Sequence, residues 1–378
     1  MKTLKFKVDD VLPALNKVAT VVNPKNAIPV LGCILFETSE DGKELTLTSS
    51  DADLWLKVNV PIVTTDSAVK FCVDAKQIKQ TLSSLTGREI TIEVDEKSIN
   101  GFYDNGQFTL PTQDAYSYPY SPVNASVKKH TNINSWKLLE AITMTNFAIS
   151  DDELRPILQG IHFDFFNDRM VAAACDRVKI GRFVDDTTHN DGEVFGFTLP
   201  RKASHILQAL ITDDFDVEVE FDANNISFSD SSFNLTSRLI DGEYPNYESV
   251  IPHDNDKQAI VGKEEFLAAI KRVIPFGEAK TKMVVVKFED NYIEIVGEDL
   301  AFNTFAKERV NCEYGYEPFK ACFSGFDFIN CVNNIEGDKF MISVKAPSMP
   351  AVITPYDNAK YISVLMPMMI LGQNAPQQ

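Results

Sequence analysis

The feature that most constrains this chain is an internal repeat, because the same series of elements occurs three times. Similar apolar helical patterns lie 126 and 129 positions apart, centred on Leu12, Leu138 and Leu267. After each pattern comes an alternating strand pair that ends in an aspartate, at Asp51, Asp176 and Asp299. A recurring period of this length indicates that one structural unit is used repeatedly. The 378 residues are therefore predicted to form three copies of one domain.

Each third combines two predicted helices with strands of period two. The predicted helices cover residues 11–20, 75–85, 135–146, 200–210, 264–274 and 324–335. Segments 88–94, 216–221 and 339–344 have one apolar and one charged face, which is typical of half-buried antiparallel strands. Residues 1–7 alternate similarly and are predicted to be a strand rather than a signal peptide. The predicted fold class is α+β, with two helices covering antiparallel sheet in each domain.

The joints between the repeats also resemble one another. Tyr118-Pro119-Tyr120 and Tyr244-Pro245-Asn246-Tyr247 lie 126 positions apart, each just after the last strand of its third. Proline lacks the donor that a central strand needs, so these segments are predicted to be extended connectors. The predicted domains are 1–125, 126–250 and 251–378, with boundaries near 122–128 and 248–256.

The distribution of charge separates the helices from the rest of the chain. The formal net charge is −18, from 36 Lys and Arg against 54 Asp and Glu. Such a protein is repelled by nucleic acid unless its basic residues are gathered on one surface. The six predicted helices together carry +4, which leaves −22 on everything else. This contrast is expected if the helices face a polyanion, although ordinary helix propensities for Lys and Arg also favour it.

Several classes of chemistry have no signature in the sequence. Neither G-x-G-x-x-G, G-x-x-x-x-G-K-[ST] nor G-x-S-x-G occurs, and the five histidines are scattered without metal-binding spacing. Neighbouring acids at 151–152, 185–186 and 213–214 are interpreted as turn or cap residues. The aspartate that ends each repeated strand pair is interpreted as a structural turn residue. We expect no catalytic residues, no metal and no cofactor.

The cysteines and the hydropathy pattern bear on the compartment. Six cysteines are present and no two have C-x-x-C spacing, so they are interpreted as buried thiols in a reducing environment. No apolar stretch approaches the roughly 20 residues of a membrane helix. The expected compartment is the cytoplasm, without a membrane partner.

Four motifs in this frame resemble the bacterial sliding clamp family, the beta subunit of DNA polymerase III, over essentially the whole chain. They are Ile28-Pro29-Val30-Leu31-Gly32, Leu199-Pro200-Arg201-Lys202, Leu239-Ile240-Asp241-Gly242-Glu243-Tyr244-Pro245-Asn246-Tyr247 and Val364-Leu365-Met366-Pro367-Met368. The resemblance implies a head-to-tail homodimer that closes into a ring, with twelve helices around duplex DNA. It also implies a non-catalytic processivity factor, opened by an ATP-dependent clamp loader, that tethers the replicative polymerase.

The resemblance also implies DNA-binding residues and a partner cleft, to which we add candidates for the dimer interface. By resemblance, the DNA-binding residues are Lys25, Arg201 and Lys202, and the positive charge of the predicted helices adds Lys76 and Lys79. A cleft for short linear motifs of the replicative polymerase, other polymerases and repair proteins would be lined by Arg155, Leu158, Cys175, Arg177, Val178, Lys179, Ile180, Pro245, Val250, Val364, Met366, Pro367 and Met368. Met is adaptable and suits a site with several partners. Candidate dimer-interface residues are Phe108, Ile274 and Phe276.

The chain departs from the family pattern at the cleft. Where the family commonly has Thr-Asp-Gly-His-Arg-Leu, this chain has Cys175-Asp176-Arg177-Val178-Lys179-Ile180. Met369 replaces a usual basic residue, and a polar tail covers 371–378. We therefore expect a more apolar floor and a different motif preference.

Two other classes of function compete with a clamp. One is a carbohydrate-active hydrolase, which would need two carboxylates about 5–10 Å apart in a cleft. The other is an interaction scaffold without a role on DNA, which the charge contrast between helices and strands disfavours.

Overall fold

The computed structural model describes residues 2–61, 64–65, 68–119, 129–189, 194–358 and 360–369. The chain divides into two compact units. Unit 1 comprises residues 1–139 and 202–239, and unit 2 comprises residues 140–201 and 240–378. The predicted boundary at 122–128 and the tail at 371–378 lie outside the described residues.

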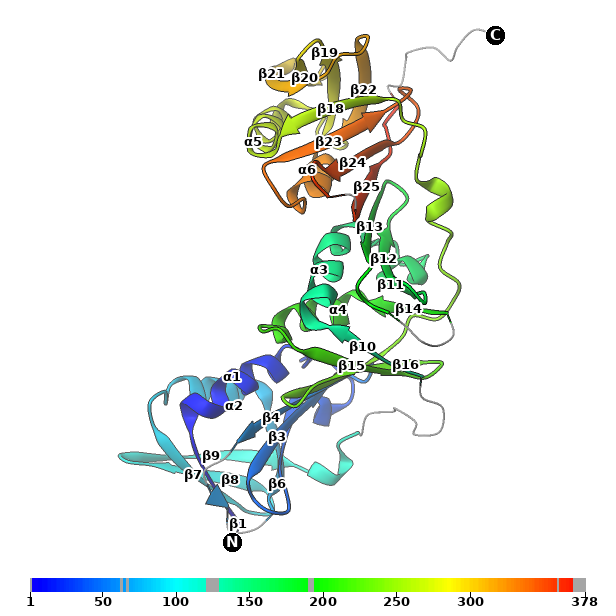
Figure 1. The fold of residues 1–378 in the computed structure, drawn as a ribbon. Coiled ribbons are helices and arrows are strands. Elements are labelled where there is room, and N and C mark those ends of the chain that lie inside the picture. The colour runs from blue at the N-terminus through cyan, green and yellow to red at the C-terminus, as the bar shows by residue number, and fades with distance from the viewer. Residues whose placement is uncertain are drawn as a thin grey trace. The chain divides into compact units, whose positions relative to one another are not determined.

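All six predicted helices are present in the described part of the chain (Figure 1). They are α1 (Val8–Ala19), α2 (Ala75–Ser83), α3 (Ser135–Thr145), α4 (Arg201–Leu210), α5 (Lys263–Val273) and α6 (Gly325–Asn333). Helix α1 begins earlier than predicted and includes Asp9 and Asp10, while α5 gains Lys263. The observed helices therefore carry +3 rather than +4, and their charge still contrasts with that of the remaining residues.

Unit 1 is built on one antiparallel sheet with 13 strands among its described residues. Its strand order is β10-β15-β16-β17-β4-β3-β2-β6-β9-β8-β7-β1-β5. Leu235 lies opposite Leu56 where β17 pairs with β4, so strands from the first and second repeats form one continuous sheet. The strands are β1 (Lys2–Lys7), β2 (Cys33–Thr38), β3 (Glu44–Ser50), β4 (Leu54–Pro61), β5 (Thr64–Thr65), β6 (Lys70–Asp74), β7 (Glu89–Val94), β8 (Ser98–Tyr103), β9 (Gly106–Gln113), β10 (Lys129–Asn134), β15 (Asp216–Phe221), β16 (Asn225–Ser229) and β17 (Phe233–Arg238).

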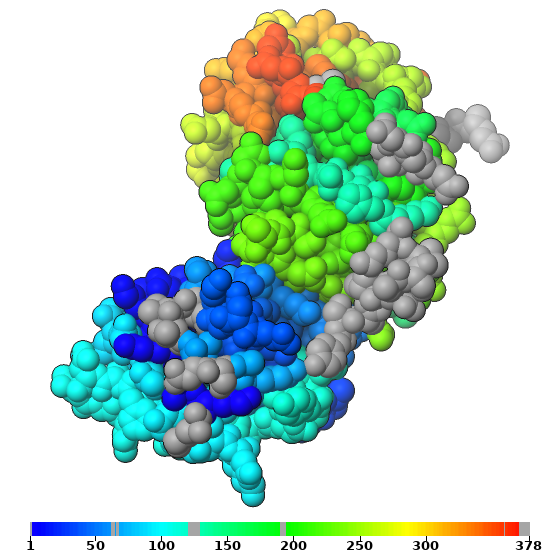
Figure 2. Space-filling view, turned by 60° about the horizontal axis from the view of Figure 1, so that its bottom comes forward, coloured from blue at the N-terminus to red at the C-terminus, as the bar shows by residue number. Residues whose placement is uncertain are grey.

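Unit 2 repeats this arrangement with 12 described strands, in the order β14-β11-β12-β13-β25-β24-β23-β18-β21-β20-β19-β22. Ile180 lies opposite Val364 where β13 pairs with β25, which joins the second repeat to the third. Figure 2 shows these two surfaces side by side, the green of residues near 180 and the red-orange of residues near 360. The strands are β11 (Gly160–Phe165), β12 (Met170–Cys175), β13 (Lys179–Asp185), β14 (Phe195–Pro200), β18 (Lys257–Gly262), β19 (Met283–Glu289), β20 (Tyr292–Asp299), β21 (Thr304–Glu313), β22 (Phe319–Ser324), β23 (Lys339–Val344), β24 (Ala351–Pro355) and β25 (Tyr361–Leu365).

Helix α2 illustrates why these sequences form amphipathic helices. Its residues Ile78 and Leu82 are four apart and fully buried, so they lie on one face. The Asp74 carboxylate caps the helix by accepting from the Gln77 backbone N–H at 2.8 Å. Lys76 and Lys79 lie on the exposed face. The same periodicity therefore fixes the core contact and presents two cations to solvent.

The repeated aspartates have the predicted structural role. In each repeat, Oδ1 of the aspartate accepts backbone N–H groups two and three residues further along, which closes the turn between two strands. The three aspartates are Asp51, Asp176 and Asp299.

None of the helices within the described ranges has the length and apolar composition required to cross a bilayer.

Candidate functional site

An apolar pocket of about 170 Å³ lies in unit 2, where the second and third repeats join. Ten of the thirteen residues predicted for the cleft line it: Arg155, Leu158, Cys175, Arg177, Lys179, Ile180, Pro245, Val250, Val364 and Met366. Asn246 and Tyr247 also line it and were not predicted. Both belong to the Tyr-Pro-Asn-Tyr connector, so the motif was available in the sequence as a signal. We call this pocket the cleft.

Four segments from distant parts of the chain build the cleft. Strands β13 and β25 pair side by side and place Ile180 opposite Val364 on the floor. The segment after β25 is held by backbone hydrogen bonds from Met366 N–H to the Val178 carbonyl (2.8 Å) and from Met368 N–H to the Cys322 carbonyl (2.7 Å). A 3₁₀ turn at Pro156–Leu158 and the connector 244–250 complete the walls.

The floor of the cleft joins two apolar clusters through Cys175. One cluster contains Leu158 and Tyr244, the other contains Ile180 and Val364, and Cys175 packs against both. Burial raises the pKa of the Cys175 thiol, which keeps it neutral at physiological pH. The floor of the cleft is therefore apolar in this chain.

Arg177 adopts a backbone conformation that normally favours glycine. Its φ is +78°, in the left-handed region, where an L-residue with a Cβ costs about 1 kcal/mol or more. The turn that Asp176 closes imposes this conformation, since its carboxylate accepts from Val178 and Lys179 N–H groups. The strained turn projects the Arg177 guanidinium to the cleft rim, 3.9 Å from the Asp152 carboxylate.

Lys179 forms a buried ion network beneath the cleft. Its side chain is only 10% exposed, and its ammonium contacts the carboxylates of Asp176 and Asp327, the latter at 2.8 Å. Burial alone would lower the pKa of Lys179, but the hydrogen bonds that its ammonium donates to the two carboxylates outweigh burial and raise the pKa. Lys179 is therefore charged at neutral pH and ties the turn before β13 to helix α6.

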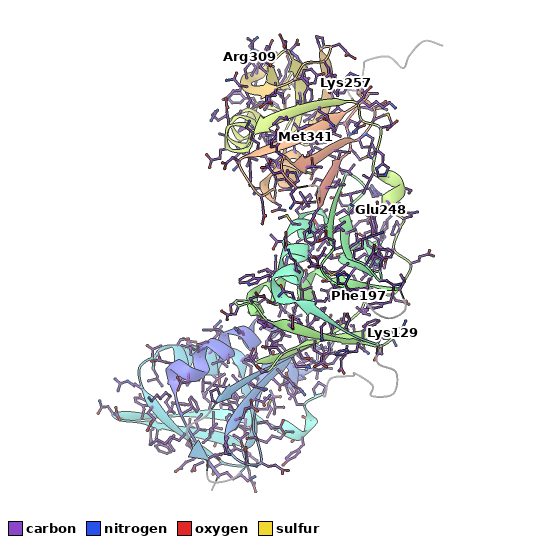
Figure 3. All side chains as sticks on the ribbon, in the orientation of Figure 1. Lys129, Phe197, Glu248, Lys257, Arg309 and Met341 are labelled. Atoms are coloured by element: carbon purple, nitrogen blue, oxygen red, sulfur yellow. The ribbon has the colours of Figure 1, made fainter. Side chains whose placement is uncertain are left out.

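A polar network supports the connector wall from behind. Tyr247 donates to Asp164 Oδ2 at 2.7 Å, and His162 Nε2 lies 3.2 Å from Asp164 Oδ1. The His162 ring stacks on Tyr244, with 4.7 Å between centroids. Arg182 donates to Glu248, labelled in Figure 3, at 2.5 Å. This network holds the aromatic side chains of the connector in place.

The Tyr247 hydroxyl should affect stability in acid. Burial alone would raise the pKa of Asp164, but hydrogen bonds from His162 and Tyr247 outweigh it and lower the pKa. A lowered pKa contributes stability above the unfolded value of about 3.9, and this contribution is lost as pH falls through the folded value. Tyr247→Phe removes one donor, so we expect a stability loss of about 1–2 kcal/mol at pH 7.

The acid-unfolding midpoint, followed by circular dichroism, should therefore move to higher pH in Tyr247→Phe. Tyr356→Phe is the matched control, because Tyr356 is exposed and its hydroxyl makes no hydrogen bond to a carboxylate among the described residues. An equal shift in both variants would contradict the role of the Asp164 hydrogen bond.

The remaining three residues predicted for the cleft lie beside it. Val178, Pro367 and Met368 line a second cavity of about 580 Å³, which shares Met366 with the cleft. We call it the side cavity.

The predicted DNA-binding cations fall into two groups. Lys25, Lys76 and Lys79 are exposed, and no ion pair engages them within the described ranges. Lys202 instead contacts the Asp51 carboxylate at 2.5 Å and the Val21 carbonyl at 2.8 Å. Because Asn26 donates to the Asp51 carbonyl at 2.9 Å, the Lys25 loop, the Asp51 turn and the start of α4 come together in unit 1.

Arg201 is held within unit 2 by three acceptors. It contacts the Asp151 carboxylate at 2.5 Å and the carbonyls of Ile149 and Ser150 at 2.9 and 3.1 Å. Arg201 therefore anchors the loop that precedes the 3₁₀ turn of the cleft, in addition to any contact with a ligand.

The candidate interface residues differ in exposure. Phe276 is 40% exposed, whereas Ile274 is only 4% exposed and packs on Gly325, where an added Cβ would lie 2.5 Å from Ile274 Cγ1. Phe108 lies across Gly101 on the neighbouring strand, where a Cβ would lie 2.1 Å from its ring. Burial in the local core makes Ile274 a structural residue rather than a surface contact.

The neighbouring acidic residues bind either the turn that follows them or a distant segment. Asp185 accepts from Thr187 and Thr188, and Asp214 accepts from Asn134 at 2.6 Å. Among the described residues, no group of three or more His, Cys, Asp or Glu is arranged to hold a metal ion.

Each of the three repeats matches a known protein family. Models of the DNA polymerase III beta subunit match residues 3–122 (N-terminal domain), 132–246 (central domain) and 248–369 (C-terminal domain). The beta sliding clamp of Caulobacter vibrioides is 25% identical, over 95% of this chain and 97% of its own. That of Staphylococcus epidermidis is 23% identical, over 97% and 99%.

Solved clamp structures have the same fold. The sliding clamp of Bartonella birtlesii bound to griselimycin superposes with a TM-score of 0.91 at 26% identity, covering 98% of this chain and all of that one. The Bacillus subtilis clamp gives a TM-score of 0.91 at 22% identity, covering 98% and 99%. With three consecutive domain matches on one repeated fold, the chain belongs to the DNA polymerase III beta subunit family, the bacterial beta sliding clamps.

Proposed function

We propose that this clamp closes as a head-to-tail homodimeric ring around duplex DNA and tethers the replicative polymerase. The observation that carries the proposal is the match of all three clamp domains, in order, to one chain. The family consists of non-catalytic processivity factors, so the chain is not itself an enzyme. Head-to-tail contacts whose rotation closes produce a ring rather than a filament.

The ring would hold DNA by enclosure rather than by base recognition. Weak phosphate attraction is sufficient for this purpose, since a protein that neutralises many phosphates binds tightly and in a salt-dependent way. Lys25, Lys76 and Lys79 are exposed and suited to such contacts, whereas Lys202 already has a carboxylate partner. The acidic character of the remaining surface would discourage DNA from binding elsewhere.

The ring interface would use an edge of the first domain and an edge of the third. Phe276, Leu300 and Phe302 are exposed in the third domain, with Leu300 84% exposed. The Thr304 hydroxyl donates to the Phe276 carbonyl at 3.1 Å, which links the start of β21 to this apolar group. Exposed apolar groups of this kind are typical of protein interfaces. We include Leu300 and Phe302 in the candidate interface and remove Ile274.

The cleft would bind short linear motifs of the polymerase, the ATP-dependent loader and repair proteins in turn. Its apolar lining and its flexible Met366 suit a site that accepts several related sequences. We also propose the domain limits 1–125, 126–250 and 251–378, and the cytoplasm as the compartment in which the clamp meets replicating DNA.

The first experiment tests whether the clamp encloses DNA. The purified chain should elute as a dimer in gel filtration at micromolar concentration. With a clamp loader and ATP, it should be retained on primed circular DNA and lost after the circle is cut. A monomer that is never retained on circular DNA would contradict the proposal.

Lys25→Ala combined with Lys79→Ala should reduce loading severalfold, because two unpaired cations near the phosphates are removed. Fold and dimerisation should be unchanged, since both side chains are exposed. Lys345→Ala is the control, because Lys345 pairs with Asp254 in the third domain. Unchanged loading of the double variant would remove these lysines from the DNA-binding set.

A further inference from the structure

The side cavity continues the cleft and has a different character. It is lined by Val178, Ala279, Lys280, Thr281, Lys282, Ser324, Phe326, Asp327, Met366, Pro367 and Met368. Its volume of about 580 Å³ is more than three times that of the cleft, at about 170 Å³. Because Met366 lines both spaces, the side cavity directly adjoins the cleft.

The charge of the side cavity is positive. Lys280 and Lys282 line it, and neither has an ion-pair partner within the part of the chain that the structure describes. Asp327 also lines it, but its carboxylate is bonded to Lys179 at 2.8 Å. The charge of Asp327 is therefore already balanced by Lys179, whereas the charges of Lys280 and Lys282 are not balanced by a partner among the described residues.

The segment that carries the lysines is held in one conformation. Lys282 N–H donates to the Glu278 carbonyl at 2.8 Å, and its own carbonyl accepts from Gly325 N–H at 3.0 Å. The Thr281 hydroxyl engages the Glu278 side chain at 2.8 Å. The lysines thus project from a fixed turn, which lowers the entropy cost of binding a ligand between them.

An apolar surface adjoins the two cations. Phe326, near the start of α6, is 56% exposed and lines the cavity with Met366, Pro367 and Met368. A ligand that fits this surface has an apolar side chain close to a negative charge. A peptide has both, and the continuity with the cleft favours a peptide over a free anion.

We propose that Lys280 and Lys282 select, among partner peptides that extend from the cleft past Met366, those that carry an acidic side chain in the flanking position. The apolar part of the same segment packs on Phe326 and Met368. The side cavity thereby selects, among motifs that fill the cleft equally well, those with Asp or Glu in the flanking position. This inference rests on the proposed role of the cleft in binding peptides.

The test uses the full-length clamp and two labelled peptides with the same apolar motif. One has an acidic flank and the other has the corresponding amides, and Kd is measured by fluorescence anisotropy. We expect the acidic peptide to bind about tenfold tighter, and this preference to shrink as salt rises from about 50 mM to about 500 mM. Lys280→Glu and Lys282→Glu should each abolish the preference and leave the affinity for the amide peptide within about twofold.

Lys320→Glu is the matched control, since Lys320 is exposed on β22 and lines neither the cleft nor the side cavity. Equal affinity of the two peptides for the wild-type clamp, or an equal loss of preference in Lys320→Glu, would overturn the inference while leaving the cleft intact. Failure of both peptides to bind would instead refute peptide binding in the cleft, and this inference with it. Competition between the acidic peptide and short single-stranded DNA, relieved by the two Glu substitutions, would assign the cavity to nucleic acid.

Discussion

Lys179→Ala should lower the free energy of unfolding by about 3 kcal/mol, the largest effect we expect from one substitution in unit 2. The substitution leaves the Asp176 and Asp327 carboxylates partly buried without their cation. It also frees the turn before β13 from helix α6, so the cleft should lose its shape and its affinity for peptides. Chemical denaturation at pH 7 measures the first effect and fluorescence anisotropy the second.

Two further variants distinguish the ion network from simple loss of a side chain. Lys179→Arg keeps the charge and should retain part of the stability. Lys345→Ala removes an ammonium from the exposed pair with Asp254, where we expect a loss below about 1 kcal/mol. The pKa of Lys179 is raised in the folded protein. Its contribution to the free energy of unfolding is therefore complete at neutral pH and is lost only as the pH rises through the raised pKa. Similar losses in Lys179→Ala and Lys345→Ala would contradict the importance of burial.

Met366→Ala should weaken binding of a polymerase motif peptide by about 30-fold, or about 2 kcal/mol. Met366 lines both the cleft and the side cavity, and the backbone hydrogen bond from its N–H to Val178 fixes its position. Truncation removes apolar contact from the centre of the site while the backbone bond remains. The unfolding free energy should fall much less than in Lys179→Ala, because Met366 is only partly buried.

Met369→Ala is the control for this measurement. Met369 is three residues away, is 85% exposed and lines neither space. Its replacement should leave Kd unchanged. An unchanged Kd in Met366→Ala would refute the assignment of the cleft as the peptide site.

The fold was largely readable in the sequence because its signals are local and occur three times. Segment 216–221 alternates with period two and forms β15 with those bounds, and the helix predicted at 75–85 is observed as α2 at Ala75–Ser83. The aspartate turns were also predicted, since a carboxylate that accepts N–H groups two and three residues ahead needs no distant partner. Repetition made each weak local pattern recognisable.

The residues of the cleft were predicted largely through family resemblance. The residues that were missed or misplaced have a physical explanation. Tyr247 was missed although its connector motif was recognised, because the side chain that faces the cleft is set by a hydrogen bond to Asp164, 83 positions away. Ile274 was predicted to be at an interface, yet it packs into the local core against Gly325. Apolar residues in the core and at an interface look alike in sequence, because both are simply apolar.

The sequence by itself determined three repeated domains, six helices, the aspartate turns and a helix charge that differs from the net charge of −18. The tertiary structure decided which lysines are paired with a carboxylate and which can bind a ligand. Lys202 pairs with Asp51, 151 positions away, and Lys179 with Asp327, 148 positions away, whereas Lys280 and Lys282 line a cavity without such a partner among the described residues. Helix and strand periodicity arise from neighbouring residues, but the neutralisation of a charge depends on which distant segment packs against it.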